Sequence, residues 1–240
     1  KKLIEVAMPI KEISAESVRD KSIRHGHIST LHLWWARRPL PVCRAVVFAS
    51  LAPDPLDPNC PQSFIDAIEI LLGSKQKPLD TEGDPYKTYA DIPWTKVIDP
   101  MEDNPRNRLQ MLIGKFSPKM EDHMLRNGKK PGAKDQLSDS SLIKWDNKNS
   151  EKIIGKARKL IWVAHNASSG LPAQALLSEF DNSYKAIKDA ESDLYGLENR
   201  HILNEELRQK EQNLRNAIES FQDKMPKVFD PFAGGGAIPL

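Results

Sequence analysis

The sequence is poor in cysteine and has no long hydrophobic run. Only two cysteines, Cys43 and Cys60, occur among 240 residues, and neither belongs to a CxxC pair. We therefore expect reduced thiols rather than a disulfide or zinc framework. No stretch has the length and apolar character of a membrane span or a signal peptide, so we expect a cytoplasmic protein that does not act at a membrane.

An excess of charge of one sign is also missing. The chain has 35 basic and 33 acidic residues, a net charge of +2, so composition alone does not indicate nucleic-acid binding. Two stretches depart from this balance, because residues 115–134 and residues 144–159 each carry six basic and two acidic side chains. Such stretches follow a DNA backbone in some proteins and are solvated faces in others, and both interpretations remain open here.

Apolar spacing predicts that most of the chain is helical. Helices are expected at residues 41–51, at residues 62–72 with Gly73 closing the helix, after a cap at Asn104, and from a cap at Ser150 to residue 166. Residues 175–223 are almost free of glycine and proline and have near-heptad apolar spacing. They predict either two long helices that break near Gly196 or one long arm.

The stretch "KVFDPFAGGGAIPL" at residues 227–240 has a different pattern. A short apolar run predicts an entering strand, the three glycines give the backbone freedom to approach a ligand, and Pro239 suits the first turn of a helix. A phosphate loop would need a GK[ST] ending and a dinucleotide site would need a later third glycine, so both are disfavoured. A glycine turn without a ligand is the alternative. Because the helix has only begun at Leu240, we expect the chain to continue.

These residues are similar to the S-adenosylmethionine motif of DNA amino-methyltransferases: Asp230, Pro231, Phe232, Gly234 and Gly236. More closely, "SIRHGHISTLHLWWARRPL" together with "DPFAGGGAIPL" resembles predicted adenine-specific DNA methyltransferases that carry an N-terminal domain of unknown function. The resemblance covers residues 3–55 and 228–240. It implies S-adenosyl-L-methionine as cofactor and methylation of the exocyclic amine of adenine in double-stranded DNA. It also implies a role in restriction-modification or phage defence, with protein partners of such a system.

The resemblance also implies roles for individual residues. The glycines would let the backbone approach the methionine part of the cofactor, and Arg38, Pro39 and Leu40 would form a second part of the same pocket. In the family the Pro-Leu segment lies shortly before the glycine motif, whereas here a long insertion separates the two. The catalytic Asp-Pro-Pro-Tyr type string is absent; "DPY" at residues 84–86 and "DIPW" at residues 91–94 are the nearest strings. We therefore expect the catalytic residues downstream of Leu240 and no methyl transfer by this chain alone.

The resulting fold prediction is mixed α/β, mostly α, with the start of a doubly wound Rossmann-like methyltransferase domain and a helical insertion. Residues 1–55 would contribute to the cofactor pocket, residues 56–149 would form an irregular and helical insertion, residues 150–225 a long-helix region, and residues 226–240 the start of the methyltransferase domain. The alternative function is a non-catalytic helical module that binds DNA or a partner protein.

Several other side chains are candidates for binding. Trp34 and Trp35 would either stack on a base or fill the core. The following arginines would bind the cofactor carboxylate or DNA phosphate: Arg24, Arg37, Arg38 and Arg44. We expect no metal site, because no carboxylate or second cysteine completes a ligand set with His25, His27, His32 and Cys43.

Overall fold

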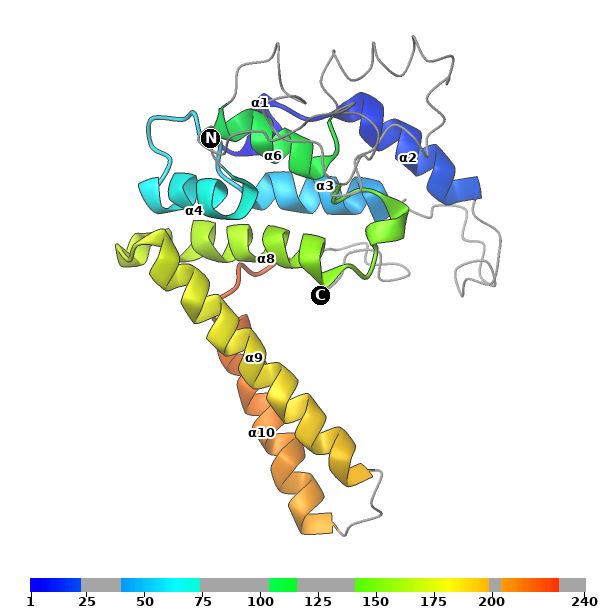
Figure 1. The fold of residues 1–240 in the computed structure, drawn as a ribbon, viewed down its shortest axis with the longest axis vertical. Coiled ribbons are helices and arrows are strands. Elements are labelled where there is room, and N and C mark those ends of the chain that lie inside the picture. Colours follow the sequence, from blue (N-terminus) through cyan, green and yellow to red (C-terminus); the bar gives the residue numbers. More distant parts are fainter. Residues whose placement is uncertain (23–39, 74–103, 116–140, 199–203, 229–240) are drawn as a thin grey trace, which may run out of the picture.

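The computed structural model describes residues 1–22, 40–73, 104–115, 141–198 and 204–228, and these residues are mostly helical (Figure 1). The helices of the body are α1 (Leu3–Val6), α2 (Ile10–Ser22), α3 (Leu40–Leu51), α4 (Gln62–Leu72), α6 (Pro105–Ile113) and α8 (Glu151–Asn166), with the short turns η3 (Trp145–Asn147) and η4 (Ala167–Ser169) on either side of α8. Two long helices, α9 (Ala173–Glu198) and α10 (Asn204–Gln222), form a hairpin that we call the arm.

The helices of the body are stacked in layers (Figure 1). Helices α3 and α4 form the middle layer, with α1 and α2 packed on α3 and with α6 packed on α4. Helix α8 packs against the other side of both α3 and α4, and it also contacts α9. The largest fully buried side chains come from all of these layers: Leu3, Phe48, Phe64, Ile68, Leu109, Ile113, Ile143, Leu160 and Trp162. The body is therefore held together by one hydrophobic core, to which α8 contributes and which continues into the start of α9.

The helices expected in the body are confirmed where the sequence has both periodic apolar residues and end signals. Helix α4 covers residues 62–72 as expected, buries Phe64, Ile68 and Leu72, and ends at Gly73 with a φ of 85°. Helix α3 starts one residue before the expected position. The N-terminus of α6 has the expected cap, because the Asn104 side chain accepts a hydrogen bond of 2.9 Å from the Asn107 amide.

The end of α6 fixes the chain that leads into α8. Gly114 follows α6 with a φ of 150°, and a Cβ built there would lie 2.7 Å from the Ser141 hydroxyl oxygen. The Ser141 hydroxyl in turn donates to the Ile113 carbonyl at 2.9 Å, and the Leu142 amide donates to the Leu112 carbonyl at 2.8 Å. Position 114 therefore requires glycine, because a side chain there would clash with Ser141. The residues before α8 thus lie directly against the end of α6.

Helix α8 and the arm follow the expected periodicity, with two differences. Helix α8 has the expected bounds, but the Ser150 side chain makes no capping hydrogen bond. Of the two forms expected for residues 175–223, the structure has two helices, and α9 continues through Gly196 to Glu198. The less exposed positions of α10 include Leu207, Leu214 and Ile218, which face α9. The packing of apolar residues between two antiparallel helices thus outweighs the weak helix propensity of a single glycine.

Aromatic side chains join the arm to the body. The Trp162 ring of α8 stacks on Phe221 of α10 with 5.3 Å between centroids, and it meets Phe180 of α9 edge to face at 5.6 Å. Tyr184 stacks on Phe180 at 5.7 Å. We call Trp162, Phe180, Tyr184 and Phe221 the aromatic junction. It fixes the base of the hairpin, while the rest of the arm extends away from the body (Figure 1).

The predicted mixed α/β class, with the start of a Rossmann-like sheet, is wrong for the part of the chain that the structure describes. There, β pairing is limited to an isolated antiparallel bridge between Lys2 and Pro53, and Lys227 and Val228 have no regular structure. The physical reason is that apolar faces with helical spacing are buried against other helices, so no sheet is needed to cover them. Among the described residues, no helix is both long and apolar enough to cross a membrane.

Candidate functional site

Most residues of the predicted cofactor pocket lie outside the described residues. This applies to Asp230, Pro231, Phe232, Gly234 and Gly236, and also to Arg38 and Pro39. Leu40 is the first residue of α3 and is half-buried. The aromatic pair Trp34 and Trp35 and the "DPY" and "DIPW" strings fall outside the described ranges in the same way.

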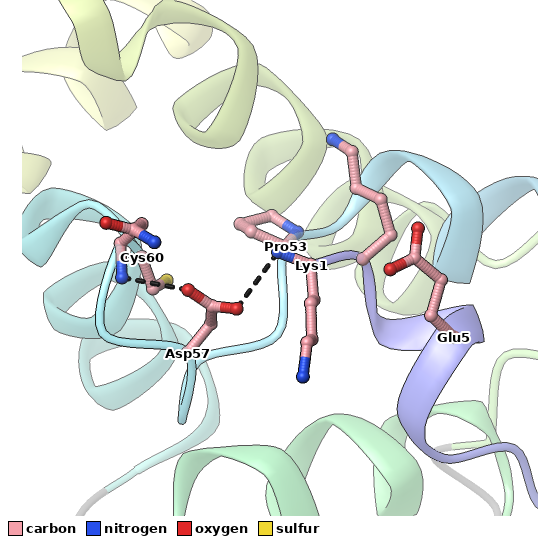
Figure 2. A pocket seen from close by; sticks show the side chains of 7 residues that line it. Lys1, Glu5, Pro53, Asp57 and Cys60 are labelled. Carbon is pink, nitrogen blue, oxygen red and sulfur yellow. Dashed lines mark hydrogen bonds and ion pairs between the residues drawn. The ribbon is translucent and has the colours of Figure 1, made fainter.

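A surface cavity of about 370 Å³ lies where the chain before α1 meets the loop after α3 (Figure 2). Its lining is charged and polar: Lys1, Lys2, Glu5, Pro53, Asp57, Asn59 and Cys60. Figure 2 shows the Asp57 carboxylate pointing between Lys1 and Cys60. That carboxylate accepts hydrogen bonds from the main-chain nitrogen of Lys1 at 3.1 Å and from the main-chain amide of Asn59 at 2.9 Å. Both of its oxygens are thus already used within the protein.

The cysteine in this cavity is not activated for nucleophilic chemistry. Burial, together with the smaller effect of the nearby carboxylates Asp54 and Asp57, raises the pKa of Cys60 to about 11. A thiol with this pKa is protonated at neutral pH, and the thiolate is the reactive form. The cavity therefore has the lining of a polar surface pocket and lacks a reactive group.

Next to this cavity, a buried ion pair connects the loop after α3 to α6. The Asp54 side chain is 3% exposed and accepts two hydrogen bonds from Arg106, at 2.8 Å from Nε and at 2.6 Å from a terminal nitrogen. The hydrogen bond from Arg106 is the main reason that the pKa of Asp54 is lowered. This bidentate pair holds two elements of the fold together, which is a structural role.

The second candidate site is the basic stretch at residues 144–159, which the structure places in η3 and the first half of α8. Lys152 is exposed and Lys156 is half-buried, one helical turn apart. Lys148 lies before the helix, with its ammonium 4.7 Å from the centre of the Trp145 ring. We define Lys148, Lys152, Gly155 and Lys156 as the α8 basic face.

Arg44 of α3 supports this face from the body. Its guanidinium donates to the Lys148 carbonyl at 2.6 Å and to the Leu142 carbonyl at 3.4 Å. Burial lowers the pKa of Arg44, and the positive charge of Arg158 lowers it further. Arg44 was expected to bind a cofactor carboxylate or a phosphate, which stays a prediction; the contacts that the structure shows are with main-chain carbonyls, and they position Lys148.

One feature of these sites could not be predicted from local patterns, and another had a local signal. The Asp54–Arg106 pair joins residues far apart in the sequence, so no spacing rule identifies it. Gly155 did carry a signal, because a glycine inside a strongly periodic helix is unusual and calls for a packing or binding reason. In the described residues no group of three histidine, cysteine, aspartate or glutamate side chains could hold a metal ion.

Comparison with known proteins gives one match. A family model described as a protein of unknown function (DUF1156) matches residues 7–70, which include α2, α3 and most of α4. No curated protein and no solved structure matches the chain. The family description names no activity, and residues 7–70 are thus the region in which this chain is similar to a domain that other proteins share.

Proposed function

We propose that this chain takes part in S-adenosylmethionine-dependent methylation of the exocyclic amine of adenine in double-stranded DNA, within restriction-modification or phage defence. The observation that carries the proposal is the sequence Asp230-Pro231-Phe232-Ala233-Gly234-Gly235-Gly236, which is similar to the cofactor motif of DNA amino-methyltransferases. The aromatic and basic segment at residues 23–40 supports it, because the same family carries a similar segment.

The proposed chemistry is direct transfer of a methyl group from the sulfonium of the cofactor to the amine nitrogen. Such a reaction depends mainly on positioning the two partners and on relieving the sulfonium charge. Asp230, Phe232, Gly234 and Gly236 are the residues proposed to hold the cofactor, with Arg38, Pro39 and Leu40 as the second part of the pocket. The target base would have to leave the duplex before it could react.

The test is cofactor binding by a matched pair of glycine variants. S-adenosylmethionine should stabilise the complete protein in a thermal-shift titration and should not stabilise its Gly234→Val variant. Gly132→Val is the control, because it makes the same substitution outside the motif. Equal stabilisation of the Gly234→Val variant and the unmodified protein would overturn the assignment of the motif to the cofactor.

A second candidate function is a non-catalytic helical module, and the arm favours it. The α9–α10 hairpin extends away from the body and is joined to it at the aromatic junction (Figure 1). A hairpin of this kind offers a long surface to a protein partner. The same thermal-shift titration separates the two functions, because the module would show no response to S-adenosylmethionine in any variant.

A further inference from the structure

The first half of α8 carries cations without matching acids. Residues four apart in an α-helix lie on the same side, about 6 Å further along the axis, and Lys152 and Lys156 have this spacing. Within the described part of the chain, neither of them forms an ion pair. The α8 basic face is therefore a row of positive charge that the described protein does not neutralise.

Two carboxylates near this row are bound to other cations. Glu151 pairs with Arg158 at 3.1 Å, and Asp181 of the arm pairs with Lys159 at 2.7 Å. The Glu151 and Asp181 carboxylates are thus bound to Arg158 and Lys159, and neither carboxylate pairs with Lys152 or Lys156. Lys188 and Lys210 of the arm, and Lys224 just after it, differ in this respect, since each pairs with a glutamate or aspartate. Lys185 of the arm has no such pair among the described residues.

Burial makes the uncompensated charge costly. The pKa of Lys156 is lowered, first by burial and second by the neighbouring charge of Lys152. Partly desolvated cations that repel each other are stabilised when an anion binds between them. The Arg44 guanidinium is held by its hydrogen bonds to the Leu142 and Lys148 carbonyls, so its positive charge stays beside the α8 basic face.

Gly155 lies between Lys152 and Lys156 in the sequence of the helix, and the described fold gives no packing reason for it. A Cβ built on Gly155 meets no described heavy atom within 4 Å. A glycine in a helix interior is about 1 kcal/mol less favourable than alanine. An open position without a side chain, flanked by lysines, lets a ligand approach the helix backbone closely.

The shape of the face favours a polymer of phosphates over other anions. A single small anion would contact one or two lysines, whereas a nucleic-acid backbone follows a row of charges. A membrane surface would need apolar side chains beside the cations, but Ile153, Ala157 and Leu160 of α8 are buried in the core. Of the polymers, duplex DNA is the one that the proposed function requires.

We propose that the α8 basic face binds the phosphate backbone of double-stranded DNA, with Lys152 and Lys156 as the contacting residues and Lys148 held in place by Arg44. The proposal rests on the DNA partner of the proposed function and is independent of its cofactor. Because phosphate contacts carry no sequence information, this face would position the protein on DNA and leave base recognition to other residues.

The experiment compares two double variants of the full chain that lose the same charge. Lys152→Gln with Lys156→Gln removes two cations from the α8 basic face, and Lys185→Gln with Lys188→Gln removes two from α9 of the arm. Binding is measured by the fluorescence anisotropy of a labelled mixed-sequence duplex over a series of salt concentrations. The first variant should bind roughly tenfold more weakly at low salt, and its slope of log affinity against log salt should decrease by about two, since each lost phosphate contact removes about 0.9.

The controls separate a binding defect from a folding defect. Lys152→Arg with Lys156→Arg should retain the salt slope, and Gly155→Ala should weaken binding several-fold while its thermal midpoint rises. An equal loss of affinity in the α9 variant, or an unchanged slope in the α8 variant, would overturn the proposal. Competition by polyglutamate as strong as that by unlabelled duplex would also overturn it and assign the face to an acidic protein. The thermal-shift titration with S-adenosylmethionine is unaffected by either result, so the cofactor assignment stands or fails separately.

Discussion

The first half of α8 and the arm both carry lysines on a helical surface, and they differ in how many of these lysines pair with a carboxylate. The arm carries ten acidic and five basic residues, and two of its three lysines, Lys188 and Lys210, are paired with carboxylates. The stretch at residues 144–159 carries six basic and two acidic residues, and Lys152 and Lys156 have no described partner. The overall net charge of +2 therefore hides a separation of charge between two neighbouring parts of the molecule.

This comparison shows that pairing matters more than the number of lysines in a stretch. A cation beside a carboxylate gains less from a phosphate, because the carboxylate repels the phosphate. An unpaired and partly buried cation is stabilised more by a bound phosphate. The arm, with its acidic excess, would repel a DNA backbone, whereas the α8 basic face is the part that we propose to attract it.

The largest expected effect comes from breaking the contact between the two parts. Trp162→Ala removes the ring at the centre of the aromatic junction, which is fully buried and contacts both Phe180 and Phe221. We expect the free energy of unfolding to fall by about 3–5 kcal/mol, as for other large-to-small substitutions in a core. Urea denaturation checks this, with Ile70→Ala as the control because Ile70 is 50% exposed. A loss below about 1 kcal/mol would show that the arm is not held at this junction.

Much of the fold was predictable because its signals are local. The apolar spacing and Gly73 predict α4, and Asn104 with Pro105 predicts the start of α6. The fold class was not predictable in the same way, because the strand expected at residues 227–229 depends on pairing partners that local sequence does not specify. In the site, the run of lysines was visible in the sequence. That Lys152 and Lys156 have no ion-pair partner among the described residues depends on the three-dimensional positions of Glu151 and Asp181.

The next largest effect concerns the buried ion pair of the body, which has no equivalent among the exposed pairs of the arm. Arg106→Met leaves the Asp54 carboxylate buried without its main partner, and we expect a loss of about 2–4 kcal/mol in urea denaturation. Adding Asp54→Asn should recover part of the loss, because the buried charge is then removed. An Arg106→Met chain as stable as the unmodified one would contradict the role of the pair.

The same pair predicts a response to pH. The folded state lowers the pKa of Asp54 below its ordinary value of about 3.9, so the unfolded state takes up a proton first as the pH falls. The stabilisation is therefore complete above about pH 4 to 5 and disappears as the pH falls through the folded pKa. Urea denaturation at a series of pH values should show a shallower acid dependence for Asp54→Asn than for the unmodified chain. Identical acid dependence in the two chains would exclude this linkage.

A smaller effect, an increase in stability, is expected at Gly155 of α8. Gly155→Ala adds a methyl group where no described atom lies within 4 Å, so we expect the free energy of unfolding to rise by about 0.5–1 kcal/mol. Thermal and urea denaturation measure it. A decrease in stability would show that the space above Gly155 is filled within the protein, and the argument for close approach of a ligand would be lost.

The smallest effect is expected for an ion pair of the arm. Lys210 pairs with Asp193 at 2.9 Å between α10 and α9, and the Asp193 side chain is 61% exposed. Exposed pairs contribute little, so Lys210→Gln should change the free energy of unfolding by no more than about 0.5 kcal/mol. A loss as large as that expected for Arg106→Met would remove the contrast between buried pairing in the body and exposed pairing in the arm.

The most direct test of the central claim, that this chain binds S-adenosylmethionine at its glycine motif, is to locate the bound cofactor on the chain. Ultraviolet cross-linking with methyl-labelled S-adenosylmethionine, followed by trypsin digestion after Lys227, releases residues 228–240 as one peptide. We expect label in that peptide. The label should be lost in the Gly234→Val variant, and excess S-adenosylhomocysteine should prevent it. Label confined to other peptides, or no label that S-adenosylhomocysteine displaces, would contradict it.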